Sequence, residues 1–214
     1  VLNAADYGVP QKRHRVFFVG FRKDQGIEWS FPEASHSQEA LLWDQAHGDY
    51  FERHRVPKVE RWSNAERVRV RAERLTERPA ELPWLTVRDA LSTLPDPEDN
   101  PAEASGLSGH RFQPGARSYP GHTGSPLDDA AKALKAGVHG VPGGENMLAR
   151  PDGSVRYFTV RESARLQTFP DTYRIEGVWS EAMRQLGNAV PVTLAERVAR
   201  SVALALQSAE STKQ

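Results

Sequence analysis

The 214-residue chain contains no cysteine. This absence excludes disulfide bonds, thiolate metal ligands and a thiol nucleophile within the chain. It also fits a reducing compartment such as a bacterial cytoplasm. Long apolar runs are lacking too, and the mean hydropathy of −0.61 is typical of a water-soluble protein.

An excess of charge of one sign is also lacking, because 28 basic residues balance 28 acidic ones. No global field therefore indicates a nucleic-acid partner, and any basic surface must be local. Residues 52–79 are dense in both signs, with nine basic and five acidic side chains around Pro57. Mixed charge of this kind favours a solvated insertion, helical in pieces, over a DNA-binding face.

At the N-terminus, the sequence predicts the end of one strand, a turn at residues 7–10 and a second strand over 16–21. The second segment is apolar with almost no alternation. A short continuous apolar run is typical of a strand that is buried on both faces, as in α/β sheets.

Three helices are predicted from their caps and periodicity. Residues 86–95 form a short amphipathic helix with Thr86 as its N-cap. Residues 159–162 have the capping-box pattern, and the helix that they start ends before Pro170. After residues 186–192 comes the strongest helix, whose apolar residues recur every fourth position and form a packing face: Leu194, Val198, Val202 and Leu206.

Two segments are rich in residues that break helices and strands. Residues 95–126 contain eleven Pro or Gly, which predicts loop, yet they also contain aromatic and basic residues that linkers usually lack. Residues 136–147 contain four glycines, which let backbone approach a partner closely.

The segment "QKRHR" at residues 11–15 places polar side chains at the start of the apolar run. Because strand side chains alternate, Gln11, Arg13 and Arg15 share one face, while Lys12 and His14 share the other. The amide and two guanidiniums could bind a phosphate, a carboxylate or a base carbonyl. A sheet edge made soluble by charge explains the same pattern equally well.

Two other patterns have ordinary interpretations when taken alone. The segment "GNAVP" could leave backbone N–H groups for an anion, but it is also a common helix start. Arg161 and Arg165, four residues apart, could reach a phosphate, but tying their helix to a neighbour is the favoured interpretation.

Taken together and in order, three segments resemble the last three motif blocks of the DNA cytosine-5 methyltransferases: "LNAADYGVPQKRHRVFFVGF", "RYFTVRESARLQTFPD" and "QLGNAVPVTLAERVA". The resemblance covers roughly the first 35 residues and everything from about residue 86. It implies an α/β fold in which residues 1–30 end a Rossmann-like catalytic sheet and a small irregular α+β domain recognises the target. The C-terminal helix would pack back on the catalytic domain.

The same resemblance implies domain boundaries. Residues 1–35 would hold the last strands of the catalytic domain, 36–185 the target-recognition domain and 186–214 the returning turn and helix. Within the recognition domain, residues 39–81 look like a charged insertion of unassigned role, and residues 105–155 would hold the recognition loops.

The family's chemistry implies roles for individual residues. A flipped cytosine receives a methyl group from S-adenosylmethionine after a Cys thiolate adds to C6. By resemblance, Arg15 stabilises charge on that cytosine, Arg13 lies close to the flanking phosphates, and Gln11 shapes the pocket. The turn around Asn188, with Gly187 and Ala189, would approach the methionine end of the cofactor. Residues 161–167 would frame the recognition domain.

Double-stranded DNA is the implied partner. Its sequence would be read by side chains of the loops, for which the candidates are Arg111, Arg117, His122, Thr123, Lys135, His139 and Asn146. Loops do not reveal from sequence which of their side chains reach the major groove, so the recognition sequence stays open.

The family's Gly-rich cofactor loop, its Pro-Cys nucleophile and its Glu-Asn-Val block are not in this chain. We therefore expect no methyl transfer from this chain alone. We interpret it as the C-terminal part of a longer enzyme of a bacterial restriction-modification system, or as one subunit of a split enzyme that needs an N-terminal catalytic half. The lack of an initiator Met favours the former. The alternative is a free-standing DNA-binding or regulatory module that has lost catalysis.

Overall fold

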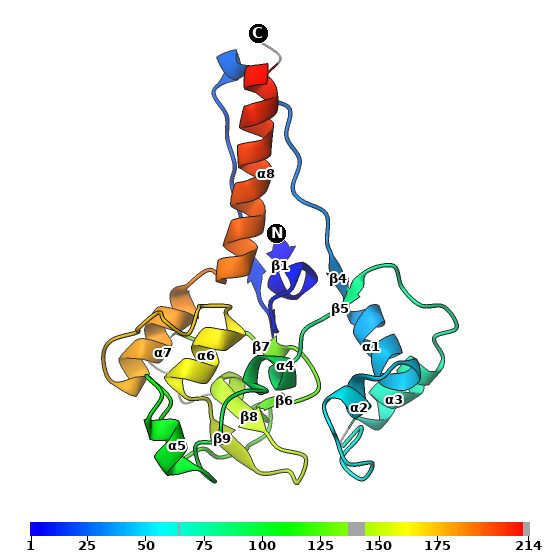
Figure 1. Ribbon diagram of the computed structural model, residues 1–214, viewed down its shortest axis with the longest axis vertical. Coiled ribbons are helices and arrows are strands. Elements are labelled where there is room, and N and C mark those ends of the chain that lie inside the picture. Colours follow the sequence, from blue (N-terminus) through cyan, green and yellow to red (C-terminus); the bar gives the residue numbers. More distant parts are fainter. Residues whose placement is uncertain (64, 137–143, 212–214) are drawn as a thin grey trace.

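The computed structural model describes residues 1–63, 65–136 and 144–211, which form a mixed α/β arrangement of small sheets and one long helix (Figure 1). Along the chain the elements are β1 (Leu2–Asn3), η1 (Ala4–Tyr7), β2 (Gln11–Lys12), β3 (His14–Arg15), η2 (Lys23–Gln25), β4 (His36–Ser37), α1 (Gln38–His47), α2 (Tyr50–Arg53), α3 (Glu66–Glu73), β5 (Leu82–Pro83), α4 (Val87–Leu91), α5 (Pro101–Ser105), β6 (Ser125–Pro126), β7 (Ala131–Lys132), η3 (Gly144–Asn146), β8 (Met147–Ala149), β9 (Val155–Tyr157), α6 (Val160–Leu166), α7 (Trp179–Asn188) and α8 (Val192–Ser211). None of these helices is both long and apolar enough to cross a membrane.

The body of the molecule, residues 84–188, is built around a three-stranded sheet in the order β6-β8-β9. Strand β6 pairs with β8 in parallel, and β8 pairs with β9 antiparallel. Apolar side chains from this sheet and from α4, α6 and α7 form one buried cluster, with Phe158 and Leu166 fully buried. This cluster is the main core. Burying each of its large apolar side chains stabilises the fold by about 1.5–3 kcal/mol.

The N-terminus and the C-terminal helix meet beside the body. Leu194 at the start of α8 packs against the buried Ala4, Tyr7 and Val9. From there α8 projects outward, and residues 16–35 run up and down beside it (Figure 1). Trp29 Nε1 donates a hydrogen bond of 3.1 Å to Ser201 Oγ and fixes this extended segment on the helix.

The expected buried strand over residues 16–21 is wrong for this structure. Strands β1 and β3 pair antiparallel, with Leu2 opposite Arg15, but the pairing ends there. Val16 is 59% exposed and Phe18 is 95% exposed. The physical reason is that no strand among the described residues lies beside the segment, and a strand needs neighbours to be buried on both faces.

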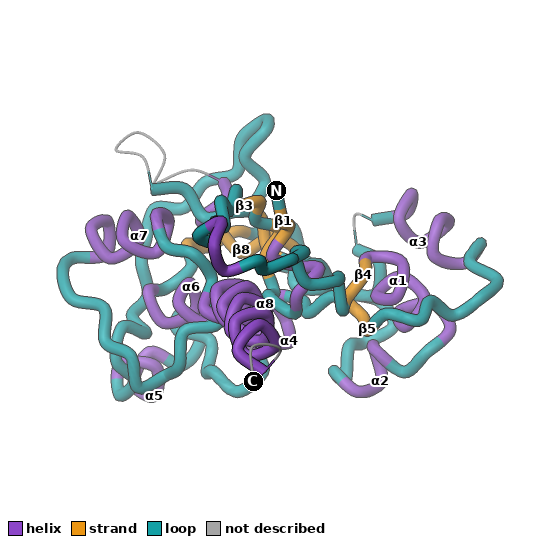
Figure 2. The backbone as a smooth tube through the Cα atoms, turned by 90° about the horizontal axis from the view of Figure 1, so that it is seen from above, coloured by secondary structure: helices purple, strands orange, loops and turns teal. Residues whose placement is uncertain are grey.

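Residues 38–81 form a separate helical lobe, shown beside the rest of the chain in Figure 2. The chain enters the lobe at β4 and leaves it at β5, and these two strands pair side by side. Helices α1, α2 and α3 enclose Leu41, Tyr50, Phe51 and Val56, which share a cluster with residues of the body. The lobe is therefore joined to the body by a common core as well as by its two connecting strands.

The local signals in the sequence predict several elements correctly. Thr86 and Thr159 each cap their helix through a complete capping box, with Asp89 and Glu162 as the respective acidic partners. The last helix is confirmed as α8, but its packing face is only partly buried, since Leu206 is 42% exposed. Helix α5 corrects the prediction that residues 95–126 are entirely loop, because Pro101 is well suited to a first helical turn.

Candidate functional site

The segment 11–15 spans β2 and β3 and alternates as predicted. Gln11 and Arg13 are buried and Arg15 is half-buried, whereas His14 on the opposite face is exposed. Lys12, also on that opposite face, forms an ion pair of 2.7 Å with Asp129. The amide and the two guanidiniums therefore lie on one side of the strand, the side toward the body.

The Arg13 guanidinium donates only to main-chain carbonyls in the described part of the chain. Its Nη1 lies 3.0 Å from the oxygen of Leu134, and its Nη2 bonds to the oxygens of Gly187 and Ala189, the latter at 3.1 Å. The parallel pairing of β2 with β7 brings Leu134 close. Arg13 is 2% exposed. Its buried side chain links the segment 11–15 to Leu134 and to the turn at residues 187–189.

Arg15 also donates to the Ala189 carbonyl, from the solvent side of it. Its Nη2 donates to Ala189 O at 3.3 Å, and its Nη1 donates to His14 O at 3.0 Å. Burial lowers the pKa of Arg15 from its ordinary value, because a partly desolvated cation is disfavoured. The guanidinium stays charged at neutral pH, since an arginine in a protein does not lose its proton.

The turn that follows α7 carries the predicted cofactor residues. A Cβ on the buried Gly187 would lie 2.6 Å from the backbone nitrogen of Ala136, so only glycine fits there. Asn188 is exposed and its amide has no hydrogen-bond partner among the described residues, while Ala189 is half-buried. Of these three residues, only Asn188 can offer a side chain to a ligand.

Two residues at the end of α6 hold the far side of this turn. Gln167 Nε2 donates to Leu186 O, and the Val192 N–H donates to Gln167 O at 3.0 Å. Thr168, whose φ of 59° is unusual for threonine, accepts the Thr193 N–H on its Oγ1 at 2.9 Å. The N–H groups of Val192 and Thr193 at the start of α8 are thus already bonded, and these two are not free for the anion that the "GNAVP" pattern could have held.

The buried Gln11 has an unusual environment. Its side chain is fully buried, and within the described structure neither its Nε2 nor its Oε1 has a hydrogen-bond partner. A buried amide without partners costs free energy, and the described contacts do not offset that cost at Gln11.

The candidate DNA readers differ in their surroundings. Arg111 and Arg117 are exposed and form no ion pair among the described residues. His122 and Lys135 both approach Glu145, whose oxygens lie 3.6 Å from His122 Nδ1 and 2.8 Å from Lys135 Nζ. Tyr119 stacks on the His122 ring with centroids 4.3 Å apart.

The remaining candidates are held by the fold or lie outside it. Asn146 is fully buried, and its side chain bonds to the backbone N–H and carbonyl of Lys135 at 3.1 and 3.3 Å. This geometry favours a structural role for Asn146 over base contact. Thr123 is exposed and accepts a bond from Lys132 Nζ at 3.2 Å. His139 lies outside the described residues.

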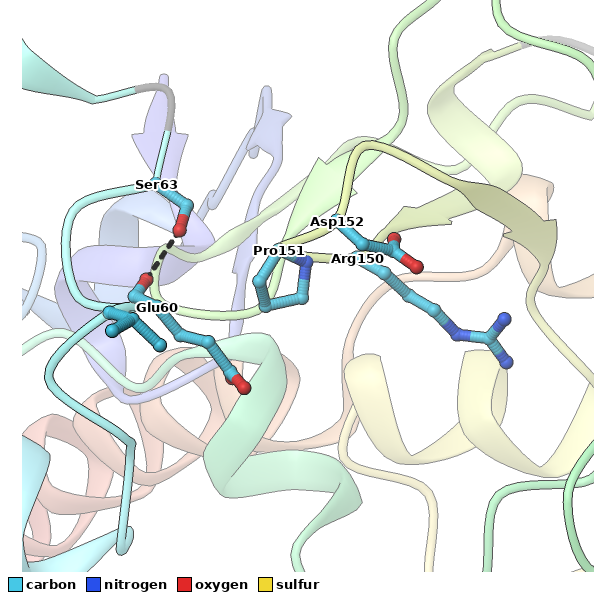
Figure 3. A pocket seen from close by; sticks show the side chains of 6 residues that line it. Glu60, Ser63, Arg150, Pro151 and Asp152 are labelled. Carbon is cyan, nitrogen blue, oxygen red and sulfur yellow. Dashed lines mark hydrogen bonds between the residues drawn. The ribbon is translucent and has the colours of Figure 1, made fainter.

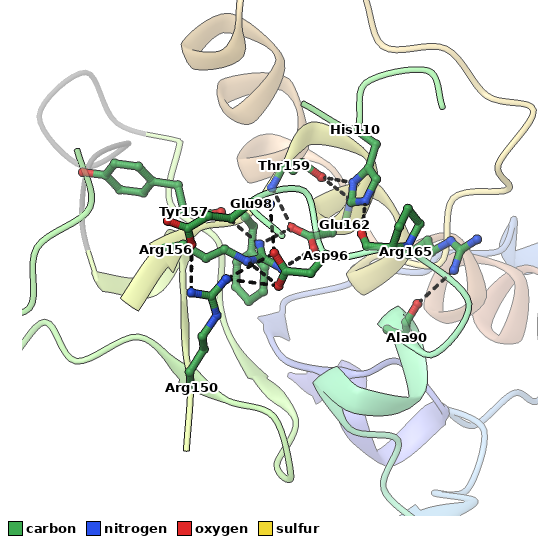
Figure 4. Close-up of polar contacts among 12 residues, drawn as sticks. Ala90, Asp96, Glu98, His110, Arg150, Arg156, Tyr157, Thr159, Glu162 and Arg165 are labelled. Atoms are coloured by element: carbon green, nitrogen blue, oxygen red, sulfur yellow. Dashed lines mark hydrogen bonds and ion pairs between the residues drawn. The ribbon is translucent and has the colours of Figure 1, made fainter. Parts of the chain in front are cut away.

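A buried polar network ties the loop segment at residues 95–110 and strand β9 to α6 (Figure 4). Arg156 bonds to Glu162 at 2.7 Å and to Asp96 at 3.2 Å, with both Arg156 and Glu162 buried. His110 lies 2.8 Å from Thr159 Oγ1 and 2.8 Å from Pro95 O. Loop segments that the sequence presents as irregular are therefore fixed by ion pairs and caps.

Arg161 and Arg165 tie α6 to its neighbours, as the favoured interpretation expected. Arg161 donates to the carbonyls of Ser108 and Tyr173, at 3.0 and 3.1 Å. Arg165 pairs with Asp171 at 2.5 Å.

A surface hollow of about 310 Å³ lies between the lobe and the turn that joins β8 to β9 (Figure 3). Val59, Glu60, Ser63, Arg150, Pro151 and Asp152 line it. In Figure 3 the Arg150 guanidinium points away from Glu60, consistent with its ion pairs to Asp96 and Glu98. None of the predicted site residues lines this hollow, and the two arginines remain the candidate site.

Sequence reasoning missed Glu145 and the way in which Gln167 and Thr168 hold the turn. Glu145 follows two glycines of a predicted loop. The signal that the sequence offered was an acidic residue among the residues proposed to read bases. Thr168 gave no signal, because nothing in the residue order indicates a left-handed threonine or its bond to α8.

The comparisons with known proteins agree on one family. The family described as C-5 cytosine-specific DNA methylase matches residues 1–203. The type II methyltransferase M.AplI of Arthrospira platensis is 31% identical over 212 residues, which cover 99% of this chain and 48% of that protein. M.NgoFVII of Neisseria gonorrhoeae is 31% identical, with coverage of 94% and 48%.

A third relative, M.MthTI of Methanothermobacter thermautotrophicus, is 30% identical, with coverage of 94% of this chain and 54% of its own length. The chain belongs to the C-5 cytosine-specific DNA methylase family. It spans about half the length of these relatives, which are type II methyltransferases.

Proposed function

We propose that this chain is the C-terminal part of a DNA cytosine-5 methyltransferase of a restriction-modification system. The observation that carries this proposal is the convergence of Arg13 and Arg15 on Ala189, a residue 174 positions further along than Arg15. Segments from both ends of the chain would thus build one side of the site. With a catalytic half, the assembly would transfer a methyl group from S-adenosylmethionine to C5 of a flipped cytosine in duplex DNA.

Arg15 is the residue of this chain that touches the target in this proposal. Its half-exposed guanidinium would donate to the cytosine on the O2 and N3 side, where negative charge grows during nucleophilic attack. The attacking thiolate must come from the catalytic half, because this chain contains no cysteine. The exposed amide of Asn188 fits the methionine end of S-adenosylmethionine, which supplies the methyl group when bound.

The exposed apolar side chains of Val16 and Phe18 support the need for a catalytic half. Val16 and Phe18 follow β3 directly, and their side chains face solvent. A neighbouring strand from the catalytic sheet would cover them, as strands in α/β sheets are covered.

Arg111, Arg117, His122 and Lys135 are our proposed DNA contacts.

The test is reconstitution. The chain is combined with an upstream half that carries the cysteine, and transfer of a labelled methyl group to duplex DNA is measured. Arg15→Ala should reduce the rate by about 10²–10³-fold, the loss typical when one transition-state donor is removed. The exposed His14 on the opposite face supplies the matched control, and His14→Ala should keep the rate. Full activity of Arg15→Ala would refute the assigned role, and DNA binding without any methyl transfer would favour a binding module.

A further inference from the structure

We propose that Arg13 is a positioning residue for Arg15, acting through the carbonyl of Ala189, and that it makes no contact with the DNA backbone. Both guanidiniums use that oxygen: Arg13 Nη2 at 3.1 Å from the buried side and Arg15 Nη2 at 3.3 Å from the outer side. This inference rests on the proposed function for its catalytic consequence, although the coupling itself is a property of this chain.

Arg13 donates three of its five N–H groups to carbonyls and exposes none of the others to a phosphate. Both Nη atoms bond to carbonyls of Leu134, Gly187 and Ala189, and the remaining Nε is buried with no partner in the described structure. A phosphate contact requires an N–H group at the surface, because the phosphate brings its own hydration and charge. At 2% exposure, the Arg13 side chain offers none.

The shared carbonyl belongs to a turn that is fixed from several sides. Gln167 holds Leu186, Thr168 holds Thr193, and the backbone of Ala136 packs against Gly187. Arg13 adds two bonds inside this frame and links it to the strand from which Arg15 projects. Charged donors on carbonyls are among the stronger hydrogen bonds in proteins, so the frame holds the acceptor of Arg15 in one place.

Loss of Arg13 would therefore displace the Ala189 carbonyl and release one anchor of Arg15. Misplacement of a catalytic group by about 1 Å can cost on the order of a hundredfold in rate. We expect Arg13→Lys to lower methyl transfer at saturating DNA by about tenfold to a hundredfold. A lysine keeps the charge but cannot reach three carbonyls with a planar fork.

The coupling can be measured on the 214-residue chain by itself. Side-chain Nε–H signals of ¹⁵N-labelled arginine are assigned through the backbone and compared between variants. Arg13→Lys should shift the Arg15 signal and speed the rotation of its guanidinium. Arg15→Lys, at a half-exposed position that threatens folding less, should shift the Arg13 signal in return. Arg184→Lys, which alters an exposed ion pair on α7, should change neither. Unchanged signals in the Arg15→Lys chain would overturn the inference.

A double-mutant cycle in the reconstituted enzyme tests the consequence. If Arg13 acts through Arg15, Arg13→Lys should cost at most about twofold more once Arg15→Lys is present, because coupled residues are not additive. The dependence of DNA affinity on salt should stay unchanged. A phosphate contact predicts additive losses and a salt slope smaller by about 0.9, and that result would refute positioning. Absence of methyl transfer in the unaltered assembly would refute the proposed function instead, and the arginine signals would still decide the coupling.

Discussion

Arg156 in the body and Arg53 in the lobe each pair with two carboxylates, but Arg156 is buried and Arg53 is exposed. Arg156 faces Glu162 and Asp96 with 4% of its side chain exposed, while Arg53 faces Asp44 and Asp49 with 48% exposed. Water screens the pair at Arg53 and solvates its ions if they separate, whereas the buried Arg156 and Glu162 have little water to take the place of the partner. Arginine thus fixes the positions of buried side chains in the body, whereas in the lobe it mainly keeps the surface solvated.

This contrast extends to the other arginines. In the body and around the proposed site, Arg13 and Arg161 donate to main-chain carbonyls of segments far away in the sequence. In the lobe, Arg69 and Arg71 pair with exposed glutamates nearby. We infer that the lobe's charge is largely balanced within itself, which agrees with the interpretation of residues 52–79 as a solvated insertion.

The largest expected effect is the loss of the buried ion pair. Arg156→Met should lower the free energy of unfolding by about 3–5 kcal/mol, because Glu162 is left buried without its cation. Urea unfolding followed by circular dichroism measures the change. A loss below about 1 kcal/mol would mean that burial does not distinguish this pair from a surface pair.

A second prediction compares unpaired arginines in the two regions. Arg111 and Arg117 lie in the proposed recognition loop, whereas Arg67 in α3 and Arg74 at its C-cap are exposed on the lobe. In the reconstituted enzyme, replacing Arg111 and Arg117 together by Ala should weaken DNA binding on the order of tenfold or more. It should also reduce the salt slope or relax sequence preference, depending on whether phosphates or bases are contacted.

The matched control for this prediction is the double replacement of Arg67 and Arg74 by Ala, which should leave DNA affinity unchanged. Titration of labelled duplex at several salt concentrations measures both variants. A weaker complex only in the Arg67 and Arg74 variant would assign DNA binding to the lobe.

Local signals predicted the parts of the fold that depend on neighbours within a turn or two. The capping boxes at Thr86 and Thr159 need a partner only three residues away, so their sequence patterns sufficed. The alternation of residues 11–15 was likewise local. The carbonyls that Arg13 binds lie 121 to 176 residues further along, and no periodicity or spacing carries that information.

The incorrect strand at residues 16–21 has the same origin. An apolar run predicts that a segment can be covered, but the cover must come from another segment, and none of those described lies there. The positions of Arg13 and Arg15 on one face were therefore predictable, while their actual acceptors were not.

A third prediction concerns acid. Burial raises the pKa of Asp96, but the charges of Arg156 and Arg150 and its hydrogen bonds outweigh this, so the pKa lies below its ordinary value of 3.8. The stabilisation by Asp96 is therefore complete above the unfolded pKa of about 3.9 and is lost as the pH falls through the lower folded pKa. Asp96→Asn should show a shallower loss of stability between about pH 5 and pH 2 than the unaltered chain.

Urea unfolding at a series of pH values measures this dependence. Asp99→Asn, a change at an exposed carboxylate nearby, is the control and should follow the unaltered chain. Parallel curves for Asp96→Asn and the unaltered chain would show that Arg156 gains nothing from Asp96.

The smallest expected effect belongs to Arg53. Arg53→Met should lower the free energy of unfolding by less than about 1 kcal/mol, since an exposed pair gains little beyond what water already provides. Part of that loss comes from the contact of its guanidinium with the Tyr50 ring, whose centroid lies 5.9 Å away. High salt should shrink the difference between Arg53→Met and the unaltered chain but leave that of Arg156→Met nearly intact, because ions screen exposed charges much more than buried ones. If both differences respond equally to salt, the two arginines do not differ in the way that their burial implies.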